Sequence, residues 1–185
     1  SDVLEKTALE VEKIIVRGDT AAGTGNLALA DGLIKNLGSV SASTFANITY
    51  TALTAGNAQV CLQSIVAQIP ESIIETAVVY LSPKDFAAVR MAYASANYYN
   101  FGDPKTVIDE LLIYGSNTKV RSVAGLSSAN AYLVSDPENF VAVFGGNEDM
   151  QMKAWYDNET EKVKIRIKTK LGAGIRFPEL VVRSK

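Results

Sequence analysis

Residues 150–171 read MQMKAWYDNETEKVKIRIKTKL, and this stretch decides the fold more than any other part of the chain. Side chains of alternating character stand on both sides of DNETE (157–161), which is the pattern of two strands joined by a turn. We therefore predict a long antiparallel hairpin. One face of its second strand carries Val163, Ile165, Ile167 and Leu171, and the other carries Lys162, Lys164, Arg166, Lys168 and Lys170.

These five cations form the cationic row. They follow one another at about 6.6 Å, which is two strand residues, so their charges repel one another. An anionic surface opposite would relieve the repulsion, and three candidates are the acids of a neighbouring copy, acids of the same chain and nucleic acid. A charged strand also protects a sheet edge from aggregation, and the sequence leaves that alternative open. We interpret the row as a candidate contact surface for other subunits or a genome.

The distribution of charge along the chain gives the row a context. Residues 1–149 hold 9 Lys and Arg against 16 Asp and Glu, whereas residues 150–185 hold 9 against 4, within a total net charge of −2. The basic segment 150–185 can bind DNA, or it can pair with the acidic remainder of the same chain or of a neighbouring copy. We favour the acidic remainder.

Outside the hairpin, helical and strand patterns alternate, which predicts an α+β fold. Helices are expected over 2–16, 31–37 and 56–69, and another is expected to start at Ser82-Pro83, with Asp85 reaching back to cap it. Strands are expected at 76–81, 110–115, 119–123, 131–135 and 140–145, while 41–51 is compatible with loop or strand. In the first helix the apolar face is Leu4, Ala8, Val11 and Ile15, and we expect it to pack on the apolar side of the hairpin.

The sequence lacks the residue types that several kinds of catalytic site require. The chain contains no histidine and a single cysteine, Cys61, which excludes imidazole relays, thiolate metal cages and internal disulfides within this chain. Cys61 is expected in the core. Three pairs of carboxylates lie close in sequence, Glu71/Glu75, Asp109/Glu110 and Glu148/Asp149. A chain with 20 acidic residues produces that many pairs by chance. We predict no catalytic residue, cofactor site or metal site.

The glycine-rich loop that follows the first helix has two partial motifs for nucleotides. Gly18 to Gly23 has the spacing of a phosphate-binding loop, but Thr24-Gly25 stands where Lys and Ser or Thr are required. Gly23-Thr-Gly25-Asn-Leu-Ala28 matches a dinucleotide fingerprint, yet it follows a helix and lacks the ribose-binding acid. We expect a mobile loop over 18–30 that binds no phosphate.

The order of these features resembles the major capsid proteins of tailed bacteriophages, the Hong Kong 97 fold. The resemblance rests on four stretches: EKTALEVEKIIVRGD with DGL at 31–33, the strand-to-SPKDF junction at 78–86, LLIYGSNTKVRSVAGLSSANAYLVSDPENF at 111–140, and WYDNETEKVKIRIKTKLGAGIRFPELVV at the end. It implies a peripheral domain of residues 1–36 and 148–185, with a spine helix against the hairpin, and an axial domain of residues 37–147 with a mixed sheet flanked by helices. It also implies a core fragment that lacks the N-terminal arm and extended loop of the family.

The function that this resemblance implies is structural. The chain would be a capsid subunit of a phage or prophage, without enzymatic activity, that assembles with copies of itself as pentamers and hexamers into an icosahedral shell around DNA. Scaffolding and portal proteins would be further partners, and the protein would reside in the virion after assembly in the host cytoplasm. No membrane association is expected, since the longest uncharged run, 36–70, is rich in polar residues. The alternative is a module that binds a small ligand or a protein without catalysis.

Overall fold

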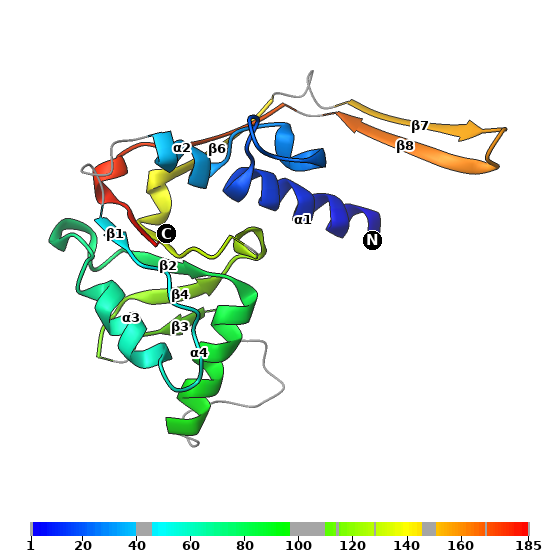
Figure 1. The fold of residues 1–185 in the computed structure, drawn as a ribbon. Coiled ribbons are helices and arrows are strands. Elements are labelled where there is room, and N and C mark those ends of the chain that lie inside the picture. The colour runs from blue at the N-terminus through cyan, green and yellow to red at the C-terminus, as the bar shows by residue number, and fades with distance from the viewer. Residues whose placement is uncertain are drawn as a thin grey trace.

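The computed structural model describes residues 2–39, 46–96, 110–113, 115–127, 129–145, 151–168 and 170–184. Figure 1 shows a body built on a sheet, a layer of helices above it, and a hairpin that projects from the body. The α-helices are α1 (Asp2–Arg17), α2 (Leu33–Ser39), α3 (Ala58–Val66) and α4 (Pro83–Ala96). Single turns of 3-10 helix are η1 (Gly25–Ala28), η2 (Glu71–Ile73), η3 (Ala124–Leu126), η4 (Pro137–Asn139) and η5 (Pro178–Leu180).

The strands form one mixed sheet and two ribbons. The mixed sheet has six strands in the order β1-β10-β5-β2-β4-β3, with parallel pairs β1/β10 and β2/β4 and antiparallel neighbours elsewhere. Strands β6 and β9 form one antiparallel ribbon, and β7 and β8 form the other. Their bounds are β1 (Ala46–Ile48), β2 (Val78–Leu81), β3 (Glu110–Leu112), β4 (Lys119–Ser122), β5 (Leu133–Ser135), β6 (Phe140–Phe144), β7 (Gln151–Asp157), β8 (Lys162–Lys168), β9 (Leu171–Ile175) and β10 (Val182–Ser184).

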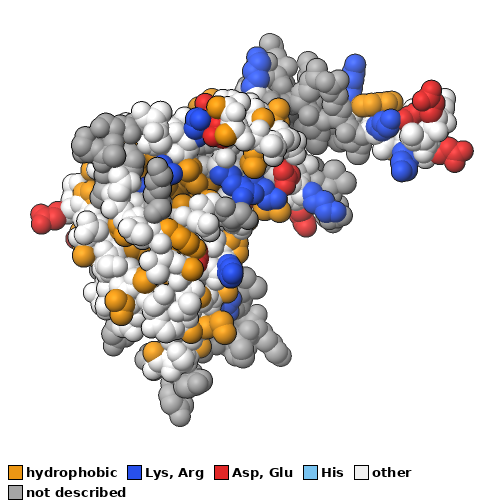
Figure 2. Space-filling model, viewed as in Figure 1, with side chains coloured by type: hydrophobic (Ala, Val, Ile, Leu, Met, Phe, Trp, Pro, Cys, Tyr) orange, Lys and Arg blue, Asp and Glu red, His pale blue; other side chains and the backbone are white. Residues whose placement is uncertain are grey.

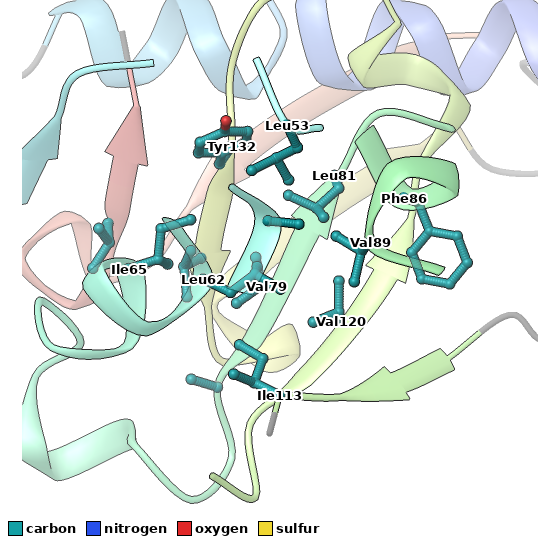
Figure 3. Close-up of a cluster of buried hydrophobic side chains, with 14 of the residues drawn as sticks. Leu53, Leu62, Ile65, Val79, Leu81, Phe86, Val89, Ile113, Val120 and Tyr132 are labelled. Atoms are coloured by element: carbon teal, nitrogen blue, oxygen red, sulfur yellow. The ribbon is translucent and has the colours of Figure 1, made fainter. Parts of the chain in front are cut away.

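The central strands of the sheet are buried on both faces. Val79 of β2 and Val134 of β5 enter the cluster that α3 and α4 cover, which Figure 3 shows with Leu62, Ile65 and Val89. The alternate residues Tyr80 and Leu133 enter a second cluster with Val16 of α1 and Leu37 of α2. Because side chains of a strand point alternately to the two faces, a continuous apolar run fits this position. The prediction of a doubly buried strand at 76–81 is confirmed for Val78–Leu81.

The junction between β2 and α4 follows the predicted capping pattern. The Asp85 amide donates to the Ser82 hydroxyl at 3.2 Å, and that hydroxyl donates to the Asp85 carboxylate at 2.8 Å. Asp85 is buried and also accepts hydrogen bonds from the Leu53 amide and the Tyr50 hydroxyl. The carboxylate therefore stabilises the start of α4 and holds the incoming segment against it.

Helix α1 forms where the sequence predicts it, but its buried face is a different one. Ile14 and Val16 are buried, whereas Ala8 of the predicted face is exposed and Val11 and Ile15 are only half-buried. The side chain of Leu4 lies outside the described residues. The reason is that α1 packs on η3 near its C-terminal end and leaves the stripe through Ala8 without a cover.

The contact between α1 and η3 is a close approach of two backbones. The Gly125 amide donates to the Glu12 carboxylate at 3.0 Å, and the Arg17 guanidinium donates to the Ser127 carbonyl. A Cβ at Gly125 would lie 2.8 Å from the Glu12 carbonyl oxygen and 2.7 Å from a methyl group of Val16. Only glycine fits between the helix and η3 at this distance.

The predicted division into a peripheral and an axial domain stays a prediction. Two pairings cross its boundaries: β10 lies within the six-stranded sheet, and β6 of the expected axial part pairs with β9 of the expected peripheral part. The uncharged segment 41–51 includes the short strand β1, and residues 41–45 lie outside the described residues.

We predict that Gly125→Ala lowers the free energy of unfolding by ~1–3 kcal/mol, the usual cost of overpacking, because the new methyl group must displace α1. Urea denaturation monitored by circular dichroism measures the change. Gly56→Ala is the matched control, since a Cβ there meets no atom within 4 Å. Equal midpoints for the two variants would contradict the close approach.

Candidate functional site: the projecting hairpin

The predicted hairpin is confirmed as β7 and β8, joined by a turn at residues 158–161. Asp157 organises this turn by accepting hydrogen bonds from the Glu159 amide at 3.1 Å and the Thr160 hydroxyl at 2.8 Å. Glu161 completes the turn with a φ of 52°, in the left-handed region. Figure 1 shows that the hairpin points away from the sheet of the body.

The register of the hairpin separates two faces of opposite character. Tyr156 lies opposite Val163, Ala154 opposite Ile165, and Met152 opposite Ile167, which makes one face entirely apolar. Directly opposite residues share a face. The other face pairs the cations of β8 with β7 residues, in the pairs Asp157/Lys162, Trp155/Lys164, Lys153/Arg166 and Gln151/Lys168.

The structure brings four of the five predicted site residues onto one strand. Lys162, Lys164, Arg166 and Lys168 occupy alternate positions of β8, whereas Lys170 lies beyond the end of that strand, before β9 begins. Lys162 and Lys170 are exposed, and the side chains of Arg166 and Lys168 lie outside the described residues. The prediction of one uninterrupted strand from 162 to 171 is wrong, because β8 ends at Lys168 and Leu171 starts the separate strand β9.

One cation of the row has an anionic partner within the hairpin. Lys164 forms an ion pair with Asp157. The hydrogen bond from Lys164 has the largest effect of those that lower the pKa of Asp157, and the others come from Thr160 and Glu159. Figure 2 shows cationic and acidic side chains together at the tip of the hairpin. Acids of the same chain therefore relieve the repulsion at the tip end of the row.

Sequence reasoning missed two further residues of the cationic face, Lys153 and Trp155. Lys153 stands directly opposite Arg166, and such like-charge pairs destabilise a sheet. Trp155 stands opposite Lys164 and is exposed over 46% of its surface. The signal was present, because the turn at 157–161 sets the register of the two strands, but the prediction considered β8 alone.

The apolar face of the hairpin is open where the structure describes its side chains. Val163 is exposed over 66% and Tyr156 over 58% of its surface. Helix α1, which was expected to cover this face, makes its larger contacts with η3, α2, η1 and β9. The expected packing of α1 on the hairpin is therefore wrong at Ala8, Tyr156 and Val163, which remain exposed.

Hydrogen bonds within the glycine-rich loop define its geometry, and its expected mobility stays a prediction. The Asp19 carboxylate accepts from the amides of Ala21 and Ala22 and pairs with Lys35 at 2.9 Å, which lowers the pKa of Asp19. Asp31 accepts from both the amide and the hydroxyl of Thr20. In a phosphate-binding loop such amides face the phosphate. Here two of them face a carboxylate, so the geometry does not support a nucleotide site.

The remaining candidates for a chemical site do not converge. Glu71 and Glu75 are exposed, and Glu110 is paired with Lys119 and Arg121, whose hydrogen bonds lower the pKa of Glu110. Asp109, Glu148 and Asp149 lie outside the described residues, and Cys61 is half-buried against the core as expected. Among the described residues there is no group of three His, Cys, Asp or Glu side chains placed to hold a metal. None of the helices described is both long and apolar enough to cross a membrane.

We predict that the tip of the hairpin loosens in acid. Because the pKa of Asp157 is lowered in the fold, its stabilising contribution is complete above its ordinary pKa of ~3.9 and is lost as the pH falls through the lowered value. The protection factors of the amides of residues 158–164, in which the intrinsic exchange rate at each pH is divided by the rate measured by NMR, should fall only at the acid end of a series between pH 2 and 6. In Asp157→Asn, which keeps an acceptor oxygen and loses the charge, the protection factors should not change with pH over this range, and a wild-type profile in that variant would contradict the role of Asp157.

Comparisons with known proteins identify the fold of the whole chain. No family model matches the sequence, and no curated protein matches it. A chain from the capsid of an empty GTA particle matches with a TM-score of 0.63 and 12% identity, covering 100% of this chain and 63% of that one.

Two further solved structures agree with that match. A chain of the satellite phage P4 procapsid, which includes a size determination protein, has a TM-score of 0.63 and 9% identity, with coverage of 100% and 61%. A virus-like particle from Pyrococcus furiosus has a TM-score of 0.51 and 12% identity, with coverage of 83% and 59%. The chain thus spans about three fifths of the length of the structures it matches. At these identities the likeness is one of fold, and the fold of this chain is that of the Hong Kong 97-like phage capsid proteins.

Proposed function

We propose that this chain is the structural core of the major capsid protein of a phage or prophage, which assembles with copies of itself into an icosahedral shell that encloses DNA. The observation that carries the proposal is that two capsid and procapsid chains match it over its whole length, projecting hairpin included. The subunits form pentamers and hexamers, with scaffolding and portal proteins as further partners. The protein assembles in the host cytoplasm and then resides in the virion.

The hairpin supports this role because, in a single chain, its apolar face is not covered and its cationic face lacks an anionic surface opposite. Its exposed apolar side chains and its facing cations Lys153 and Arg166 both gain from a surface that another molecule supplies. A subunit whose surfaces are completed by neighbouring copies is what a closed symmetric shell requires. The role is structural and uses no catalytic residue, metal or cofactor.

The cationic row serves contacts between subunits or with the packaged genome. We predict that replacing Lys162, Arg166 and Lys168 with Gln, while Lys164 keeps its pair with Asp157, leaves the melting temperature of the chain within about 2 °C of wild type, because like charges along one strand face repel one another and their removal costs the fold little. The same change in the full-length protein should lower the yield of shells, as counted by electron microscopy and sedimentation velocity.

The matched control is Lys84→Gln with Arg90→Gln, which removes two cations of the body and leaves the ion pairs of Glu110 intact. A wild-type full-length protein that stays a monomer, with a melting shift on adding a small ligand, would contradict the capsid role and favour a binding module. Normal shells from the hairpin variant would contradict the contact role of the row. Shells that form normally but retain less DNA would assign the row to the genome.

A further inference from the structure

Each strand of the hairpin has one edge that no other strand covers. Among the described strands β7 pairs only with β8, so the outer edge of each keeps a row of backbone amides and carbonyls without a strand partner. Such edges are where the sheets of different molecules join, and a row of charges along an edge prevents the joining. The two edges of this hairpin differ in that respect.

The edge of β8 is guarded by its charges. Cations occupy every second position of the strand, at Lys162, Lys164, Arg166 and Lys168. Residues directly opposite one another in an antiparallel pair share a face, and like charges in such positions destabilise the pair. Two β8 strands with their like faces aligned therefore set cation against cation in every register.

The edge of β7 is complementary to itself. When two copies of β7 lie antiparallel with Trp155 opposite Trp155, Lys153 of each copy stands opposite Asp157 of the other. The same register sets Ala154 opposite Tyr156 on the apolar face. Pairs of opposite charge and pairs of aromatic residues both stabilise an antiparallel ladder. Over residues 153–157 this register sets no like charges opposite one another.

The residues of this edge are accessible in the single chain. Trp155 is exposed over 46% and Tyr156 over 58% of its surface, and Lys153 is exposed as well. Asp157 is half-buried and already binds Lys164, so a second cation would complete its surroundings from the open side. Exposed aromatic side chains on both faces of one edge strand are typical of a surface that contacts another protein.

Resting on the proposed function, we propose that the edge of β7 pairs with the β7 edge of a second copy across a two-fold axis at Trp155. The two hairpins then form one four-stranded sheet, which removes the marginal stability of an isolated hairpin. Lys153, which stands opposite Arg166 within its own hairpin, gains the carboxylate of Asp157 from the second copy on its other side. A two-fold contact uses the same patch on both copies, so the pairing closes on itself.

A disulfide across the axis tests the register. In the full-length protein with Cys61→Ala, which removes the native thiol, Trp155→Cys places two thiols at opposite positions, where Cα atoms lie about 4.5–5.5 Å apart, a distance that a disulfide can span. Oxidised particles should yield covalent dimers on non-reducing gels. The matched control is Asn158→Cys in the same background, since the two copies of residue 158 would lie about 20 Å apart and should stay unlinked.

A charge at the axis gives a second test. Trp155→Glu places a carboxylate opposite Lys164 of the same hairpin, which does not weaken the hairpin, but it sets two carboxylates against one another across the axis. The melting temperature should not fall, while the yield of shells from the full-length protein falls about tenfold or more. The matched control, Asn158→Glu, adds the same charge in the turn and should assemble as wild type does.

The outcomes separate this inference from the proposed function. Shells that form without the disulfide of Trp155→Cys, or normal yields from Trp155→Glu, would overturn the pairing and leave the capsid role standing. A wild-type protein that never assembles would overturn both. If neither variant assembles or folds, a photo-crosslinking residue in place of Tyr156 decides the matter. Cross-links in particles to residues around Ala154 of a second copy support the pairing, and cross-links only elsewhere overturn it.

Discussion

The hairpin β7/β8 pairs with no other strand among those described, so it has no larger sheet to support it. An isolated two-stranded hairpin is at best marginally stable in water. One face leaves Tyr156 and Val163 exposed, and the other sets Lys153 opposite Arg166. In the proposed capsid, an apolar and acidic surface of a neighbouring copy would remove both deficits.

The body of the molecule differs from the hairpin, because its core is completed within the single chain. Its sheet is buried between two clusters, and α1 is joined to η3 through Gly125, Glu12 and Arg17. The ribbon β6/β9 lies beside α2 on one side, through Asn36, and leads along the chain towards the hairpin. A rigid base with an incomplete projection suits a subunit whose contacts are satisfied by assembly.

Elements with a strong local pattern were predictable from the sequence. The strict alternation around residues 157–161 predicted the hairpin, and the Ser82-Pro83 start with Asp85 predicted the beginning of α4, since both depend on neighbours in sequence. The buried face of α1 was not predictable in this way. It depends on where Gly125, more than a hundred residues away, meets the helix.

The candidate site shows the same limit. The sequence indicated the cationic row, but Lys153 joins that face only through the register of the two strands. The ion pair of Lys164 with Asp157 depends on the geometry of the turn. Strand β10 was missed because three residues carry too little pattern, although they lie within the sheet between β1 and β5.

Hydrogen–deuterium exchange of the full-length protein, compared between unassembled subunits and assembled particles, tests the central claim most directly. Our account predicts that peptides covering residues 151–168 exchange quickly in the free subunit and become strongly protected in particles, while the central strands β2 and β5 are protected in both. Equal exchange of the hairpin in the two states would contradict the claim that neighbouring copies complete it.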